Sequence, residues 1–247
     1  MLTHTYREAR QSTPFLIVCD HASAVLPDEF GPNAISAQDA ARHISHDIGA
    51  AEVTKLLGAH LPAHTFTAEI SRLVVDLNRA GDCADVIPEI SDGTDLPFNK
   101  NLSEAERSIR LMRYHLPYHL ALASIAKAHH DKHAEKSLGI LVHSFTPCLT
   151  CIEHPRPWHI GLLWRDDERT AQRLKLWFEH HTDYVVGDNE PYTAFSDASY
   201  TMRKHFGAHG IPHIAIEIRQ DLISNTDGQE KMAKVLAEAF KAVQLQQ

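Results

Sequence analysis

Three polar side chains lie at the end of, or inside, apolar stretches of the sequence, where a polar group is unusual and suggests a specific role. His21 closely follows the run FLIVC, His143 lies in LGILVHSF, and Glu217 lies in HIAIEIR, two residues before Arg219. An ionised carboxylate in an apolar strand is costly unless it is paired, hydrogen-bonded or used. Imidazoles and carboxylates together can bind a metal ion and transfer protons at neutral pH. The pattern therefore indicates a metal-dependent acid–base site.

The metal ligands are the first question. Catalytic zinc typically has three protein ligands, and His21 and His143 are the best histidine candidates because each follows apolar strand residues. The text after His21 reads HASA, so no glutamate lies three residues later. Residues 37–58 predict a helix with His43 and Asp47 at i and i+4 on its apolar face. We expect Asp47 as the third ligand and His43 as a substrate contact or a neighbour of the ligands; an internal salt bridge or a His43–Asp47 hydrogen bond is the alternative.

Glu217 fits a general base. Zinc lowers the pKa of a bound water to about 7, and a nearby carboxylate can accept its proton and pass it to a leaving nitrogen. The alternative is a structural ion pair with Arg219, which shares the same face of the strand.

The stretch SRLVVDLNR supplies groups for an anionic substrate. Read as a strand over residues 71–79, it places Arg72, Asp76 and Asn78 on one face. Arg72 at the start of this strand and Asn78 with Arg79 at its end could bind a carboxylate, and one of the arginines could stabilise the oxyanion of a tetrahedral intermediate. A salt bridge between Arg72 and Asp76 is the alternative.

The elements that must position these groups alternate between strands and helices. This pattern predicts a single domain over residues 1–247, a three-layer α/β/α fold with a mostly parallel mixed sheet. The ligand site of such a sheet lies beyond the carboxyl ends of its strands. We expect strands at 15–20, 63–70, 71–79, 138–145, 159–164, 183–188 and 213–219, and helices at 37–58, about 30 residues from the capping box Ser103/Glu106 with a kink at Pro117, 167–181, 197–209 and 227–245. The polar residues that end the apolar strands are Asp20, His21, Asp76, Asn78, Arg79, His143, Ser144, Glu217 and Arg219.

Composition narrows the class of function. The chain has 247 residues, of which 43% are hydrophobic and 23% charged, as in soluble globular proteins. A net charge of -8 without a basic stripe disfavours nucleic acid as a partner. No apolar run approaches the roughly 20 residues that span a bilayer, and the N-terminus has no apolar signal region. We therefore expect a cytoplasmic protein with no membrane partner.

The chain also contains histidines and cysteines outside these motifs. Of the 19 histidines, we expect those near the ends of polar helices to be solvated: His129, His130, His133, His180 and His181. The pair Cys148 and Cys151 has metal-like spacing but no partner pair, so we expect reduced structural thiols.

Taken together, the motifs resemble the N-formylglutamate amidohydrolase family. The stretches CDHAS, HDIGA, SRLVVDLNR, VHSFTP, GDNEPY and IEIRQDL occur in the family's order between about residues 15 and 225. That family is more distantly similar to the zinc carboxypeptidase and aspartoacylase superfamily. The resemblance implies a zinc-peptidase-like fold, His21 and His143 as zinc ligands and Glu217 as the base. It also implies that Asn78 and Arg79 bind the substrate carboxylate and that Arg72 contacts the scissile carbonyl.

The resemblance also implies a reaction and a substrate class. We expect one Zn²⁺ ion, with iron or manganese as alternatives, and hydrolysis of a small acidic N-acyl amino acid such as N-formyl-L-glutamate. A tyrosine is expected to face the substrate, and SDASYT favours Tyr200 over Tyr192; His205 is a further candidate for the pocket. The rival functions are a zinc carboxypeptidase or amidase acting on a peptide or cell-wall fragment, and a non-catalytic metal-binding protein. The sequence leaves open whether the protein forms a homo-oligomer.

Overall fold

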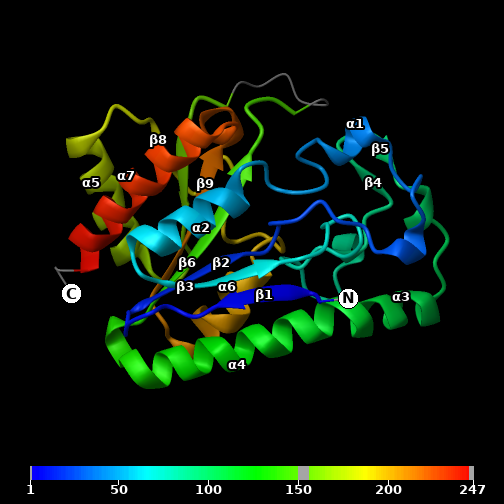
Figure 1. The fold of residues 1–247 in the computed structure, drawn as a ribbon, viewed down its shortest axis with the longest axis horizontal. Helices are drawn as coiled ribbons and strands as arrows, with labels where there is room; N and C mark the ends of the chain where they lie inside the picture. The colour runs from blue at the N-terminus through cyan, green and yellow to red at the C-terminus, as the bar shows by residue number, and fades with distance from the viewer. Residues whose placement is uncertain (1, 150–155, 245–247) are drawn as a thin grey trace.

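A seven-stranded mixed sheet runs through the centre of the molecule (Figure 1). The structure is a computed structural model that describes residues 2–149 and 156–244. In their order across the sheet, the strands are β1 (His4–Arg7), β3 (His64–Ala68), β2 (Phe15–Cys19), β6 (Leu138–Phe145), β9 (His213–Arg219), β7 (Ile160–Leu163) and β8 (Val186–Asp188). The four strands β3, β2, β6 and β9 are parallel, β1 and β7 run antiparallel to their neighbours β3 and β9, and β8 is parallel to β7. The predicted α/β fold with a mostly parallel mixed sheet is confirmed.

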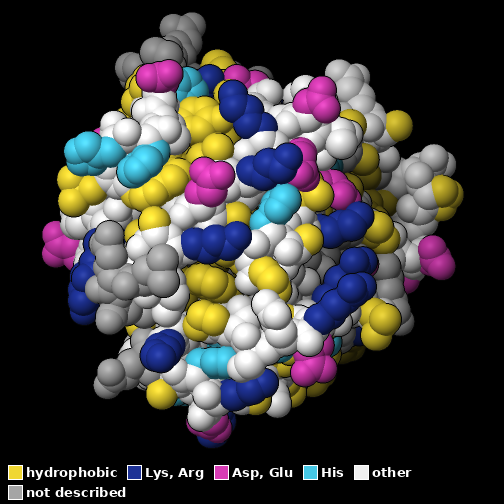
Figure 2. All heavy atoms as spheres, turned by 60° about the vertical axis from the view of Figure 1, so that its left-hand side comes forward, with side chains coloured by type: hydrophobic (Ala, Val, Ile, Leu, Met, Phe, Trp, Pro, Cys, Tyr) yellow, Lys and Arg dark blue, Asp and Glu magenta, His cyan; other side chains and the backbone are white. Residues whose placement is uncertain are grey.

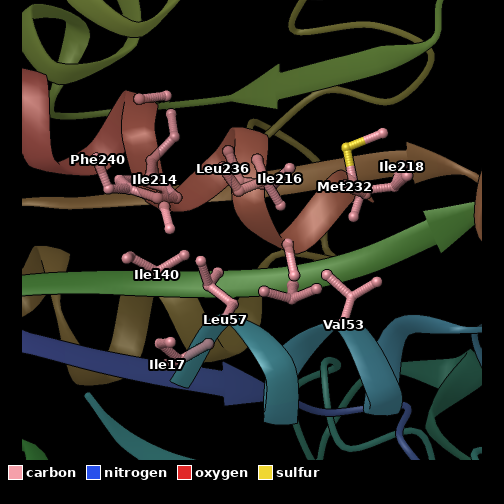
Figure 3. Packing of buried hydrophobic residues seen from close by; sticks show 14 of the residues in the cluster. Ile17, Val53, Leu57, Ile140, Ile214, Ile216, Ile218, Met232, Leu236 and Phe240 are labelled. Atoms are coloured by element: carbon pink, nitrogen blue, oxygen red, sulfur yellow. The ribbon is translucent and has the colours of Figure 1, made fainter. Parts of the chain in front are cut away.

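Helices cover both faces of the sheet (Figure 1). On one face lie α2 (Ala50–His60), α5 (Glu168–His181) and α7 (Thr226–Gln244), and on the other lie α4 (Leu116–His133) and α6 (Tyr200–His205). Figure 3 shows the first core, where α2 and α7 pack on the central strands through Val53, Leu57, Met232, Leu236, Phe240, Ile140, Ile214 and Ile216. Full burial of each such side chain stabilises the fold by about 1.5–3 kcal/mol. Both faces of β2, β6 and β9 are thereby covered, which accounts for their continuous apolar sequences.

The predicted helix over residues 37–58 is wrong, because it divides into α1 (Ala37–Ala40) and α2 with a non-helical link between them. Gly49 immediately precedes α2 with a φ of 77°, and a Cβ at this position would lie 2.3 Å from the carbonyl oxygen of Ile223. This left-handed, tightly packed position favours glycine and prevents one continuous helix. Asp47 therefore lies in the link, where its backbone N–H donates to the carbonyl of His21 over 2.9 Å.

The predicted strand over residues 71–79 is also wrong. After β3 the chain forms consecutive turns, in which the Ser71 hydroxyl donates to the carbonyl of Ser45 over 2.7 Å and accepts from the N–H of Leu73 over 3.2 Å. Leu73, Val74 and Val75 are buried all the same. A short apolar run shows burial, but it does not show which backbone conformation is buried.

The long helical segment after Ser103 follows its prediction in outline. Ser103 and Glu106 form the capping box at the start of α3 (Glu104–Arg110), and a π-helical turn, Leu111–His115, joins α3 to α4. This wider turn lies just before Pro117, which has no N–H to donate. The hairpin of β4 (Ile90–Ser91) and β5 (Thr94–Asp95) precedes α3 in the chain. The helix expected at 197–209 is shorter, as α6 ends at His205.

Several surface features also bear on the sequence predictions. On the face in Figure 2, Lys and Arg side chains lie among acidic, histidine and hydrophobic ones. No helix among the described residues is long and apolar enough to cross a membrane.

The prediction that His129 is solvated is wrong: it is buried and donates from Nε2 to the Pro14 carbonyl over 2.9 Å, and burial lowers its pKa to about 4. Cys148 is exposed, while Cys151 lies outside the described residues.

Candidate metal and active site

A pocket of about 760 Å³ opens at the carboxyl ends of the central strands. Its lining combines the strand-end residues with segments that cross over the edge of the sheet. The predicted site residues among them are His21, His43, Asp47, Arg72, Asn78, Arg79, His143 and Glu217. The structure thus brings together eight predicted residues that come from five separate stretches of the sequence.

Two imidazoles and a carboxylate converge at the base of this pocket. The Nδ1 atom of His143 lies 2.8 Å from Oδ2 of Asp47, and the Nδ1 atom of His21 lies 3.4 Å from the same oxygen. All three side chains are buried, and their ligand atoms lie within 4.8 Å of one another. The Nδ1 atom of His21 has no hydrogen-bond partner within the described part of the chain. Among the residues that the structure describes, this is the one group of three that could hold a metal ion, and its donor set suits a catalytic divalent metal.

A second layer of charges surrounds the group. The Nε2 atom of His21 lies 2.8 Å from Oδ1 of Asp76, whose other oxygen accepts from Arg72 over 2.8 Å. Arg72 also lies 3.4 Å from Oδ1 of Asp47. The salt bridge between Arg72 and Asp76, which the sequence left open as an alternative, is therefore present. The Arg72 side chain also lines the pocket.

These charges set the protonation of the group. Burial and Arg72 oppose a positive charge on His21, but Asp76 and Asp47 outweigh them and raise its pKa to about 9. Burial would raise the pKa of Asp47, yet His21 and His143 hold that pKa far below its usual range. Without a metal ion, a proton on His21 therefore balances the negative charge of Asp47 near neutral pH, and a divalent cation would displace that proton.

Glu217 lies beside the group. In the parallel pair of β6 and β9, His143 is the direct partner of Glu217, so both side chains leave the same face of the sheet. On the other side β7 places Gly161 opposite Glu217, and a Cβ there would lie 3.1 Å from the Cβ of Glu217 and 2.2 Å from a backbone oxygen. Glu217 is 7% exposed, and its Oε2 atom has no hydrogen-bond partner among the described residues. Burial, as the largest cause, raises its pKa to about 7.

The alternative ion pair for Glu217 is wrong. Arg219 binds the carboxylate of Asp221 instead, with its Nε donating over 2.8 Å and its Nη2 over 3.2 Å. Glu217 is therefore a buried carboxylate without a compensating cation on its own strand, as expected of a group with a chemical task.

Asn78 and Arg79 line the adjacent wall of the pocket. The Oδ1 atom of Asn78 accepts from the backbone N–H of Thr201 over 3.1 Å, which directs its amide nitrogen towards His143. Arg79 is anchored through its carbonyl, which accepts from Nε2 of His115 over 2.8 Å. Its guanidinium lies 3.6 Å from Asp76 and lines the pocket, where it can meet an anion.

The remaining predicted residues divide into two groups. His43 lines the pocket with its Nε2 atom 3.4 Å from Asp92 of the β4–β5 turn. Tyr200 does not line the pocket; its hydroxyl accepts from Lys204 over 2.6 Å, whereas Tyr192 does line the pocket. His205 is buried outside the lining and lies 2.8 Å from His119. The motif GDNEPY, which contains Tyr192, carried the better signal for the tyrosine.

Comparisons with known proteins identify the family and the fold. A crystal structure of a gene product from Agrobacterium tumefaciens is similar to this chain, with 32% identity, a TM-score of 0.91, and coverage of 98% of this chain and 94% of that chain. The crystal structure of N-formylglutamate amidohydrolase from Ralstonia eutropha has the same fold, with 18% identity, a TM-score of 0.73, and coverage of 99% and 97%. No curated protein sequence matches the chain. The family model of the N-formylglutamate amidohydrolases matches residues 13–224. The chain therefore belongs to this family and is a hydrolase that acts on amide C–N bonds.

Proposed function

We propose that the protein hydrolyses the amide bond of a small acidic N-acyl amino acid, with N-formyl-L-glutamate converted to formate and glutamate. The proposal assigns one Zn²⁺ ion to His21, Asp47 and His143. The observation that supports it most is the convergence of one ligand atom from each of two imidazoles and a carboxylate within 4.8 Å, next to the buried carboxylate of Glu217. When bound, a zinc ion would supply polarisation of the substrate carbonyl and a lowered pKa for a coordinated water.

Glu217 is assigned the proton transfers. Its pKa of about 7 places it close to the operating pH, where a general base is most effective. In its ionised form it accepts a proton from the attacking water and then donates that proton to the leaving nitrogen. The opposing Gly161 lets β7 and a backbone oxygen pack closely against Glu217, because a Cβ there would lie 2.2 Å from that oxygen and 3.1 Å from the Cβ of Glu217.

The cationic side chains are assigned the substrate's negative charges. Arg79 and Asn78 bind a carboxylate of the amino acid, because both line the pocket and Arg79 is anchored through its backbone. Arg72 faces the pocket from between Asp76 and Asp47, and we assign to it the developing negative charge on the scissile oxygen. His43 is assigned a substrate contact elsewhere in the pocket lining.

The first test combines metal analysis with a substrate screen on the purified protein. Release of formate from N-formyl-L-glutamate is compared with hydrolysis of N-formyl-L-glutamine, N-acetyl-L-glutamate and short peptides, before and after chelation and after addition of zinc, manganese or iron. We expect the acidic N-formyl substrate to be cleaved best, activity to disappear with chelation, and zinc to restore it.

Two variants test the metal ligands, and the substrate screen separates the rival functions. His143→Ala should lose bound zinc by atomic spectroscopy, whereas His180→Ala, a change at an exposed position on α5, should keep it. Cleavage of peptides alone would refute the substrate and favour a carboxypeptidase. Bound zinc without hydrolysis of any of these compounds would refute the catalytic assignment and favour a metal-binding protein. Zinc retained by His143→Ala would refute the ligand set.

A further inference from the structure

Asp20 is a buried carboxylate that the proposed chemistry does not use. Its side chain is fully buried, at the end of β2 beside His21. Its Oδ1 atom accepts from the Tyr118 hydroxyl over 2.5 Å and from the Thr201 hydroxyl over 3.0 Å. Its Oδ2 atom has no hydrogen-bond partner in the described parts of the chain, although it lies 3.7 Å from Nε2 of His143. A carboxylate oxygen left unsatisfied in the protein interior is costly, so its position calls for a reason.

The ring of His143 has two different sides. Its Nδ1 atom faces Asp47, where the candidate metal ligands converge, and its Nε2 atom faces Asp20 and Asn78. A neutral imidazole carries one proton. If Nδ1 gives its lone pair to a metal ion, that proton must be on Nε2, and Nε2 then needs a hydrogen-bond acceptor.

Asn78 cannot be that acceptor. Its Oδ1 atom accepts a hydrogen bond from the backbone N–H of Thr201, which can only donate. The amide NH₂ group therefore faces Nε2 of His143 at 3.5 Å. An amide NH₂ group only donates, and it therefore favours a ring with a lone pair on Nε2 and the proton on Nδ1. Oδ2 of Asp20 favours the opposite form, with the proton on Nε2 and Nδ1 left for the metal.

We propose that Asp20 is a positioning residue that holds His143 in the form with the proton on Nε2, the form that binds a metal ion through Nδ1. The inference depends on the metal site of the proposed function. Tyr118 of α4 and Thr201 of α6 anchor Oδ1 and thereby aim Oδ2 at the ring. Asp76 makes the equivalent contact with Nε2 of His21 over 2.8 Å. Each candidate histidine ligand thus has Nδ1 towards the metal position and a carboxylate behind Nε2.

The variant Asp20→Asn tests the inference, because it replaces one carboxylate oxygen by an NH₂ group of similar size. The donors from Tyr118 and Thr201 keep the amide oxygen on their side, so the new NH₂ group faces Nε2 of His143 and opposes a proton there. We expect the dissociation constant for Zn²⁺, measured at fixed pH by competition with a chelator, to rise by about 10–100-fold. Tyr118→Phe is the matched control: it keeps the carboxylate while removing one of its anchors, and we expect a smaller rise.

Two further measurements distinguish positioning from a general structural role. We expect the metal-free Asp20→Asn protein to melt no lower than the wild type, because a buried carboxylate has been replaced by a neutral amide. In the wild-type zinc protein, NMR of ¹⁵N-labelled histidine should show the His143 proton on Nε2. This spectrum needs no variant and therefore tests the inference even if Asp20→Asn does not fold.

Two results would overturn the inference. They are an Asp20→Asn variant that binds zinc as tightly as the wild type, whether or not it melts earlier, and a spectrum with the His143 proton on Nδ1. A wild-type protein that binds zinc but cleaves no N-acyl amino acid would refute the proposed function, while the zinc titrations would still decide the role of Asp20. A wild-type protein that binds no divalent metal would refute both.

Discussion

Replacement of Glu217 by glutamine should make the metal-free protein more stable above about pH 7. The same change should remove the activity of the zinc-loaded protein. Burial raises the pKa of Glu217 from its ordinary value of 4.5 to about 7. The folded state therefore holds a proton that the unfolded state has already released, and wild-type stability falls as the pH rises from about 4.5 through about 7. At about 1.4 kcal/mol for each pH unit, the loss is about 3 kcal/mol. A glutamine side chain cannot ionise and avoids this loss, so Glu217→Gln should match the wild type near pH 4.5 and exceed it above pH 7.

Thermal unfolding of both proteins in a chelating buffer, between pH 4.5 and 8, measures this difference. For a chain of this length, about 3 kcal/mol corresponds to roughly 6–12 °C in Tm at the alkaline end. Glu238→Gln, a change at an exposed position on α7, is the matched control and should show no pH-dependent gain. A difference between Glu217→Gln and wild type that stays constant with pH would refute the raised pKa. Hydrolysis near the wild-type rate in zinc-loaded Glu217→Gln would refute its role as the base, for which we expect a loss of at least about 100-fold.

The other predictions concern the pocket walls. Arg79→Lys should raise KM for N-formyl-L-glutamate by about 10-fold with little change in kcat, because lysine keeps the charge but not the two-pronged contact; a changed kcat with an unchanged KM would contradict carboxylate binding. Steady-state kinetics should change in Tyr192→Phe, because Tyr192 lines the pocket, and not in Tyr200→Phe; the reverse would restore the sequence-based choice. Gly161→Ala should lower both Tm and kcat, because its Cβ would meet a backbone oxygen at 2.2 Å, while Gly81→Ala, whose Cβ would meet nothing nearer than 3.9 Å, should leave Tm unchanged.

The sequence was a good guide at β6 and β9, where polar residues lie at the carboxyl ends of apolar strands. His143 and Glu217 were expected at one edge of the sheet, and the register of β6 and β9 makes them direct neighbours. Strand ends are predictable because side chains in parallel strands alternate and because the carboxyl ends of such strands meet at one edge. The mostly parallel sheet followed from the same alternation of apolar runs and helical patterns.

Asp47 shows how a correct position can follow from incorrect reasoning. The helical wheel placed it inward on a helix over residues 37–58, but the chain leaves the helix there and Asp47 lies in the link before α2. Its inward position comes from a backbone hydrogen bond to His21 and from the tight approach of Gly49 to Ile223. Neither contact leaves a periodic signal in the sequence, since each joins residues distant along the chain.

The sequence by itself determined the kinds of groups in the site and the edge of the sheet at which they meet, because strand periodicity and residue chemistry are local properties. Only the tertiary structure decided which groups face one another. It pairs Arg219 with Asp221 rather than Glu217, places Tyr192 rather than Tyr200 in the pocket lining, and puts Asp20 behind His143. These outcomes depend on turns, on the space left by a missing Cβ and on competition among several partners, all of which arise only when distant segments pack together.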